Sequence, residues 1–165
     1  MRRKCKKVKL GNIFIGGNEK IAVQSMLNVP ADDIKGNIKQ ANELKEAGCD
    51  VIRVAVPNIE SVKLIHEIKS KVDIPLVADI HFDYKIALEC VNAGVDKIRI
   101  NPGNIGDESR VKAVAHKCNS KNIPIRIGVN SGSLEKEILD KYLHTTPEAL
   151  CESALNHVAL LEKFD

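Results

Sequence analysis

Hydrophobic positions follow two spacings, which alternate along the chain from residue 21 onward. Short apolar runs predict β-strands at 21–26, 51–56, 76–80, 97–101 and 125–129. Between these runs, apolar residues recur every three or four positions, as they do on one face of an amphipathic helix. Strands that alternate with helices favour a parallel sheet with right-handed crossovers.

Capping residues indicate where the intervening helices begin and end. The first helix is expected from about 33 to 47, with Asp32 as its N-terminal cap and Gly48 after its last turn. The last helix is expected to have Thr146 as cap and Pro147 in its first turn. Its predicted inner face consists of Leu150, Ala154, Val158 and Leu161. The other helices are expected after Pro57, after Asp83, from Asp107 and after Ser133.

A repeated motif supports serial strand–helix units. Residues 47–53 (AGCDVIR) match residues 93–99 (AGVDKIR), and such repeats are typical of stacked supersecondary units. We predict an α/β fold of the (β/α)8 TIM-barrel type, truncated after about five βα units. Residues 1–18 are expected to form a basic tail and a β-hairpin, and residues 19–165 a partial barrel domain that binds substrate.

Five units leave one strand edge unpaired and some apolar helix faces uncovered. Exposed edges and apolar patches favour association. We therefore expect this chain to self-associate, which light scattering would test.

Composition excludes several classes of protein. The net charge is +3 and aromatic residues make up 3%, whereas nucleic-acid surfaces combine a basic face with stacking aromatics. The basic run at 2–7 is expected to be a solvated tail, so no nucleic-acid partner is predicted. Since neither a signal peptide nor an apolar stretch of about 20 residues is present, we expect no membrane association and a cytoplasmic location.

The five cysteines lie far apart in the sequence, at Cys5, Cys49, Cys90, Cys118 and Cys151. No two of them have the spacing of a zinc or iron–sulfur site, so no metal ligand is expected in this chain. In a cytoplasmic protein, reduced and mostly buried thiols are expected.

One face of each predicted strand is aliphatic and the other is polar, because side chains alternate along a strand. Arg53, Arg99 and Arg126 fall on the polar face, which lines the axis of a barrel, together with Asp79 and Lys97. One carboxylate cannot neutralise three arginines, whose burial is costly without a counter-ion. A bound anion such as phosphate would balance them. An Arg–Asp network that merely fills the barrel is the alternative.

Two loops and one histidine extend this hypothesis. Loops 101–106 (NPGNIG) and 128–132 (GVNSG) precede predicted helices, where backbone N–H groups can be presented to phosphate. His81 follows a strand end and can donate to phosphate, transfer a proton or make a structural hydrogen bond. The remaining histidines are expected at the surface: His66, His116, His144 and His157.

Five stretches together resemble one family over nearly the whole chain. They are 23–26 (VQSM), 48–57 (GCDVIRVAVP), 75–84 (PLVADIHFDY), 97–106 (KIRINPGNIG) and 125–134 (IRIGVNSGSL). The chain is similar to the 4-hydroxy-3-methylbut-2-enyl diphosphate synthases of the non-mevalonate isoprenoid pathway. The resemblance implies an oxidoreductase that reductively dehydrates and opens 2-C-methyl-D-erythritol 2,4-cyclodiphosphate to give 4-hydroxy-3-methylbut-2-enyl diphosphate.

The resemblance also implies a cofactor and partners. The family carries a 4Fe–4S cluster, held by three cysteines and one glutamate of a C-terminal domain. It forms a homodimer in which the cluster of one subunit caps the barrel of the other, and ferredoxin or flavodoxin supplies electrons. The cluster ligands would lie beyond residue 165, so this chain by itself is expected to be inactive.

Site residues follow from the same resemblance. Arg53, Arg99 and Arg126 are expected to bind the diphosphate, and Asn101 and Asn130 to help fix it. The N-terminal hairpin is expected to cover the bottom of the barrel.

Other roles stay open at this point. Asp79 and His81 lie in the same motifs and are the catalytic candidates. Leu27 and Val29 stand where the family usually has threonines, which puts hydroxyl contacts from this loop in question. Two alternative functions are a pteroate-synthase-like transferase, for which scarce aromatics offer little stacking surface, and a non-catalytic half-barrel that binds phosphorylated metabolites.

Overall fold

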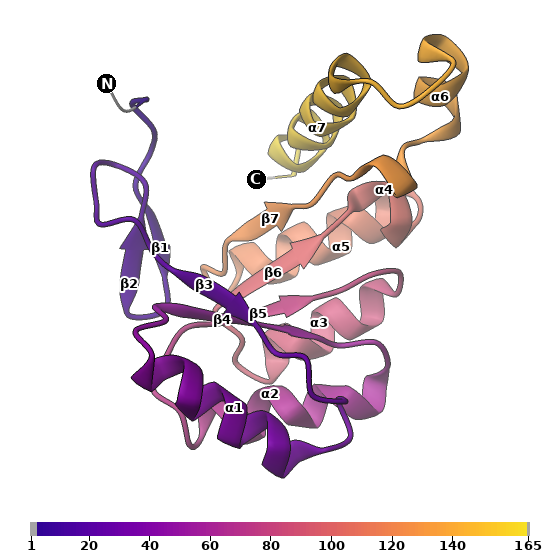
Figure 1. Ribbon diagram of the computed structural model, residues 1–165. Helices are drawn as coiled ribbons and strands as arrows, with labels where there is room; N and C mark the ends of the chain where they lie inside the picture. Colours follow the sequence, from indigo (N-terminus) through magenta and orange to yellow (C-terminus); the bar gives the residue numbers. More distant parts are fainter. Residues whose placement is uncertain (1–2, 165) are drawn as a thin grey trace.

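The computed structural model describes residues 3–164, apart from the side chain of Pro102, and within this range it contains two sheets (Figure 1). The smaller sheet is an antiparallel hairpin of β1 (Val8–Leu10) and β2 (Ile13–Ile15). The larger sheet is parallel and has the order β3-β4-β5-β6-β7. This order follows the sequence, as it does in serial βα units of a TIM barrel.

Each strand of the parallel sheet lies where the apolar runs predict one, and each is slightly shorter. The five strands are β3 (Gln24–Met26), β4 (Val51–Ala55), β5 (Leu76–Asp79), β6 (Lys97–Ile100) and β7 (Ile125–Ile127). The ladder continues by single hydrogen bonds past four of these ends, for example from Val56 N to Asp79 O and from Ile80 N to Arg99 O. Asn101 leaves β6 because it caps the helix that follows.

Helices connect the strands, and most of them begin at a residue whose side chain caps the first turn. They are α1 (Ile34–Glu46), η1 (Ile59–Val62), α2 (Lys63–Lys69), α3 (Tyr84–Asn92), α4 (Pro102–Ile105), α5 (Glu108–Asn119), η2 (Ser131–Ser133), α6 (Lys136–Tyr142) and α7 (Pro147–Glu162). The short α4 was not predicted. Over residues 3–164, no helix combines the length and apolar character needed to cross a lipid bilayer.

Two predictions about helix ends and faces need correction. Asp33, and not Asp32, caps α1, since its carboxylate accepts from Gly36 N at 2.9 Å. Thr146 caps α7 as predicted. The buried residues of α7 are Ala149, Ser153 and His157, whereas the predicted apolar face, Leu150, Ala154, Val158 and Leu161, is only partly buried or exposed. Ser153 and His157 are buried because they pack on the carboxylate of Glu135, as described below.

The main core lies between the parallel sheet and helices α1, α2, α3 and α5, which cover one of its faces (Figure 1). Ile52, Leu76 and Ile98, from the aliphatic face of three strands, are fully buried there. Leu27 belongs to this core and is 5% exposed. Its side chain therefore contributes to packing on the helix side, where a threonine hydroxyl would also point away from the polar face of the sheet.

The hairpin covers the amino ends of the strands on the opposite face. Leu10 is buried against Val51 and Val77, and Ile13 and Ile15 pack around them. Val51 lies two residues before Arg53, and Val77 two residues before Asp79, so strand alternation places them on the same face as these polar groups. The predicted cover at the bottom of the sheet is therefore present.

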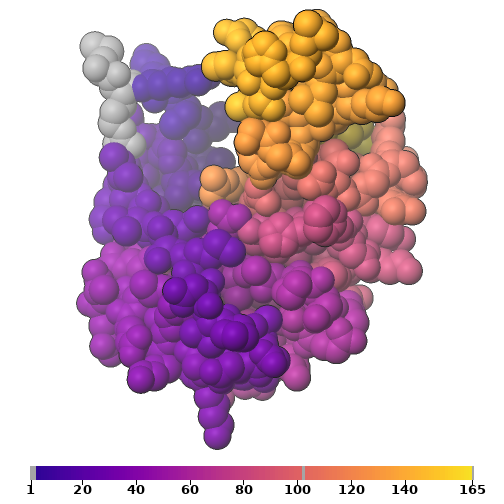
Figure 2. All heavy atoms as spheres, turned by 45° about the vertical axis from the view of Figure 1, so that its right-hand side comes forward, coloured from indigo at the N-terminus to yellow at the C-terminus, as the bar shows by residue number. Residues whose placement is uncertain are grey.

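The parallel sheet is open within the described residues, where β3 and β7 each pair with one neighbour. In the space-filling view, open space separates the indigo hairpin region from the yellow α7 (Figure 2). The fold is thus five consecutive βα units of barrel type without closure over residues 3–164.

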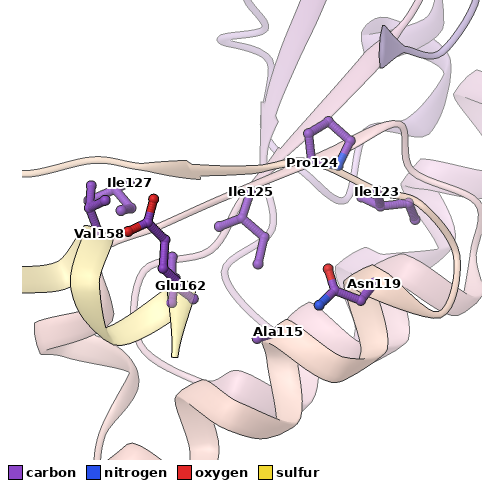
Figure 3. Close-up of a pocket in the computed structure, with 9 residues that line it drawn as sticks. Ala115, Asn119, Ile123, Pro124, Ile125, Ile127, Val158 and Glu162 are labelled. Carbon is purple, nitrogen blue, oxygen red and sulfur yellow. The ribbon is translucent and has the colours of Figure 1, made fainter. Parts of the chain in front are cut away.

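A pocket of about 300 Å³ lies on the helix side of β7 (Figure 3). Ile125 and Ile127 line it from β7, and Val158 and Glu162 line it from α7. Arg126 lies between the two isoleucines in sequence, so alternation places its side chain on the opposite face. The pocket is therefore separated from the arginines by β7 itself.

The cysteines divide into two groups. Cys90 and Cys118 are buried in the core, whereas Cys5 and Cys151 are exposed and Cys49 is intermediate; all five are free thiols. The prediction of mostly buried thiols is therefore wrong for Cys5 and Cys151. Burial raises the pKa of both the Cys90 and the Cys118 thiol to about 12.

Native alkylation is expected to distinguish these groups. At pH 8 a thiol with a pKa of about 12 is ionised in roughly one molecule in ten thousand, and the thiolate is the reactive form. Iodoacetamide should modify Cys5 and Cys151 readily, and Cys90 and Cys118 only after unfolding. Peptide mass spectrometry would measure this, and equal labelling of all four thiols in the native protein would contradict the buried core positions.

Candidate anion-binding site

Asp79 is the centre of the polar face and is fully buried. Asp79 is the last residue of β5. In the strand register it pairs with Ala55 of β4 and with Arg99 of β6. Arg99 Nη1 donates to Asp79 Oδ1 at 3.0 Å, and Arg53 donates to Oδ2 from Nε at 3.0 Å and also from Nη2. One carboxylate thus holds two guanidinium groups, which come from the strands on either side of β5.

Arg126 extends this row without a carboxylate of its own. It pairs in register with Arg99, and its residue is exposed. Over residues 3–164, no hydrogen bond or ion pair involves its side chain. The three predicted arginines therefore share one face, and their charge exceeds that of Asp79. The predicted Arg–Asp network exists, but it includes two arginines and leaves the third unpaired.

Lys97 adds a further positive charge to which the sequence analysis gave no role. It lies on β6 two residues before Arg99 and is 8% exposed. Burial lowers the pKa of its ammonium group, and the nearby charge of Arg126 lowers it further. Strand alternation predicts that Lys97 lies on the polar face, but its burial depends on tertiary packing.

Gly128 gives the Arg99 guanidinium a second hydrogen-bond partner, in addition to Asp79. Its carbonyl accepts from Arg99 Nη2 at 3.0 Å, while its N–H donates to Ile100 O at 2.8 Å. A Cβ at this position would overlap the Nε, Nη2 and Cζ atoms of Arg99. The guanidinium of Arg99 therefore occupies space that only a glycine at position 128 leaves free.

Asn101 and Asn130 hold two loops together in this structure. The Nδ2 group of buried Asn101 donates to Ser133 Oγ at 2.7 Å, and its Oδ1 accepts from Gly103 N at 3.2 Å. Asn130 Oδ1 accepts from Gly132 N at 3.2 Å. The two loops are thus joined side by side at the carboxyl ends of β6 and β7.

These contacts correct one part of the loop hypothesis. The N–H groups of Gly103 and Gly132 are bonded to asparagine side chains, and that of Gly128 to the β6 strand. They are not free to bind phosphate as the loop pattern predicted. Among the predicted donors, the arginines keep unused N–H groups, whereas these three amides do not.

His81 lies at the edge of the site. Its Nε2 is 3.5 Å from Asp79 Oδ2, and about half of its side chain is exposed. The nearby Asp83 carboxylate accepts from Lys85 N and caps α3. The predicted surface position is wrong for His157, which is buried against Glu135.

The described residues do not form a cluster of metal ligands. Over residues 3–164, no three histidine, cysteine, aspartate or glutamate side chains are grouped so as to hold a metal ion. The free thiols are dispersed between the core and the surface. These residues do not fit the donor set of a 4Fe–4S cluster.

The parallel strands, with arginines gathered around one carboxylate at their carboxyl ends, define an α/β protein of the barrel type. Residues 5–165 match the GcpE TIM-barrel domain, and the chain belongs to this family. This result confirms the family resemblance and the TIM-barrel fold class predicted from the sequence.

Two relatives show how much of the family protein the chain represents. It is 54% identical over 164 residues to the 4-hydroxy-3-methylbut-2-en-1-yl diphosphate synthase (flavodoxin) of Clostridium perfringens, covering 99% of this chain and 47% of the relative. It is 57% identical over 160 residues to the protein of the same name from Caldicellulosiruptor saccharolyticus, covering 97% and 46%. The chain therefore spans about half the length of the curated relatives it matches.

Solved structures with a similar fold belong to another class of enzyme. The 7,8-dihydropteroate synthase of Vibrio fischeri superposes with a TM-score of 0.68 at 14% identity, covering 97% of this chain and 62% of that one. The dihydropteroate synthase of Xanthomonas albilineans gives 0.60 at 12% identity, covering 91% and 61%. At such low identity the likeness shows the fold alone.

Proposed function

We propose that this chain is the substrate-binding part of a 4-hydroxy-3-methylbut-2-enyl diphosphate synthase. The whole protein would reductively dehydrate and open 2-C-methyl-D-erythritol 2,4-cyclodiphosphate. The proposal is supported by the family membership and by the names of relatives more than 50% identical to the chain.

The observation that carries the proposal is the unbalanced charge of the polar face. Arg53 and Arg99 share the Asp79 carboxylate, and Arg126 and Lys97 have no acidic partner within residues 3–164. Each arginine carries five N–H donors in a planar fork, and only some of them are used by Asp79 and Gly128. A diphosphate offers several oxygens and a negative charge, which match both the free donors and the charge excess.

The proposed roles differ among the site residues. Arg53, Arg99 and Arg126 bind the diphosphate oxygens, and Asp79 orients the first two of them. His81 lies close enough to the same carboxylate to donate to a bound oxygen. Asn101 and Asn130 fix the loops beside the diphosphate.

The remaining components are proposed from the family alone. A 4Fe–4S cluster would supply electrons to the substrate, with ligands from outside the described residues. Flavodoxin or ferredoxin would donate those electrons, and flavodoxin is the donor in the printed names of the relatives. A cytoplasmic homodimer is part of the same proposal.

Arg126→Gln in the full-length protein is the direct test. Because the Arg126 side chain has no partner within residues 3–164, its loss should leave the melting temperature unchanged. It should weaken binding of the cyclic diphosphate about tenfold, the effect of losing one charge-assisted contact worth about 1.5 kcal/mol. Isothermal titration calorimetry would measure the affinity.

Lys39→Gln provides the matched control, since it removes one positive charge from the exposed surface of α1. It should bind the substrate like the wild type. Equal affinity in Arg126→Gln and wild type would contradict the site, and preferential binding of a pterin would favour the transferase alternative.

A further inference from the structure

A polar cluster is buried beside the site, between α6 and α7. Glu135 precedes α6, and Ser153 and His157 lie one turn apart on α7. Ser153 is fully buried and His157 is 6% exposed. Burial of polar groups is costly unless they are bonded to one another, so this cluster needs an explanation.

Both oxygens of the Glu135 carboxylate are directed at α7. Its Oε2 accepts from Ser153 Oγ at 2.8 Å, and its Oε1 lies in contact with His157 Nε2. A nucleophilic triad would instead require the histidine to contact the serine hydroxyl. Because both groups contact the carboxylate and Ser153 is inaccessible, the cluster does not have the geometry of a nucleophile.

The cluster also abuts the backbone of α4. A Cβ on Gly103 would lie 2.9 Å from Glu135 Oε1, 3.4 Å from His157 Nε2 and 3.5 Å from Asn101 Oδ1. Glu135, His157 and Asn101 therefore surround the first turn of α4. The carboxylate and the imidazole therefore lie directly against this turn.

A second connection runs along the chain. Glu135 follows Ser133 by two residues, and Ser133 accepts from Asn101 Nδ2 through both its hydroxyl and its carbonyl oxygen. The Ser133 hydroxyl also bonds to Asn130 Oδ1 at 2.9 Å. Displacement of Glu135 would move Ser133 and, with it, both asparagines.

We propose that Glu135, Ser153 and His157 are positioning residues that set the two asparagine loops for the diphosphate. This inference rests on the proposed function, and it adds residues of α7 that lie behind the site. None of the three contacts the arginine face; they act through Asn101, Asn130 and the first turn of α4.

The test compares two charge-neutralising variants of the full-length holoenzyme. Glu135→Gln removes the carboxylate of the cluster, and Glu152→Gln removes a carboxylate that also joins α6 to α7, through Lys141 Nζ at 2.7 Å and Tyr142 OH at 2.7 Å. Glu135→Gln should raise KM for the cyclic diphosphate about tenfold with little change in kcat, since misplaced contacts weaken substrate positioning. Glu152→Gln should leave KM unchanged.

Inorganic pyrophosphate separates this inference from the proposed function. Its affinity, measured by calorimetry, should fall about tenfold in Glu135→Gln and remain unchanged in Glu152→Gln. Wild-type protein that binds pyrophosphate but does not convert the cyclic diphosphate would overturn the proposed function, while the two variants would still decide the inference.

If Glu135→Gln does not fold, Ser153→Ala takes its place, since it removes a single hydrogen bond. Equal KM and equal pyrophosphate affinity in all variants would overturn the positioning role.

Discussion

Asp79→Ala is expected to lower the free energy of unfolding by about 3–5 kcal/mol, the cost of removing one partner from a buried ion pair. The Asp79 side chain is 1% exposed, and those of Arg53 and Arg99 are 22% and 12% exposed. Loss of the carboxylate would leave two largely buried guanidinium groups close together with no opposing charge. Urea unfolding monitored by circular dichroism would measure the change.

Asp83→Ala is the matched control, since it removes a partly solvated carboxylate that caps α3. Loss of a cap costs only about 1 kcal/mol. Pyrophosphate should restore more stability to Asp79→Ala than to Asp83→Ala, because a ligand that binds only the folded state stabilises it. A loss no larger in Asp79→Ala than in Asp83→Ala would show that the carboxylate does not hold the arginines together.

Gly128→Ala is expected to weaken diphosphate binding about a hundredfold, equivalent to about 3 kcal/mol. The added methyl group would overlap the Arg99 guanidinium, which must then leave both Asp79 and the Gly128 carbonyl. Gly128 does not have a left-handed backbone in the described structure, so alanine adds no conformational strain of its own. Calorimetry with pyrophosphate or with the cyclic diphosphate would measure the loss.

Gly132→Ala serves as the control in the same loop. Its Cβ would lie 3.7 Å from Asn130 Oδ1, an ordinary contact, so this variant should bind like the wild type. If Gly128→Ala binds the diphosphate as tightly as Gly132→Ala, the position of Arg99 is not important for binding. The proposed set of binding residues would then be wrong.

The alignment of the arginines was predictable from the sequence because the chain repeats a local stop signal. Gly48 and Gly94 both adopt positive φ after a helix, 90° and 86° respectively, and β4 and β6 begin three residues after them. This fixed spacing makes Arg53 and Arg99 the third residue of their strands. Alternation along each strand then places them on the same face.

The partners of these groups were not predictable in the same way. The pairing of Asp79 with two arginines, and the burial of Lys97 and His157, depend on contacts between residues distant in sequence. Asn101 was correctly placed at a strand end, but its amide caps the first turn of α4. Alternation specifies a face of a strand, whereas tertiary packing decides which groups on that face remain free.

The shared carboxylate has a consequence for the entropy of binding. Arg53 and Arg99 are immobilised by Asp79 when the chain folds, so a ligand does not need to restrict their rotamers. Ordering a long side chain at an interface costs about 0.5–1.5 kcal/mol, and for these two arginines that cost falls on folding instead. Arg126, which has no partner within residues 3–164, would be ordered only by the ligand. If the chain binds a diphosphate as proposed, two of its arginines would be ordered before binding and the third would become ordered on binding.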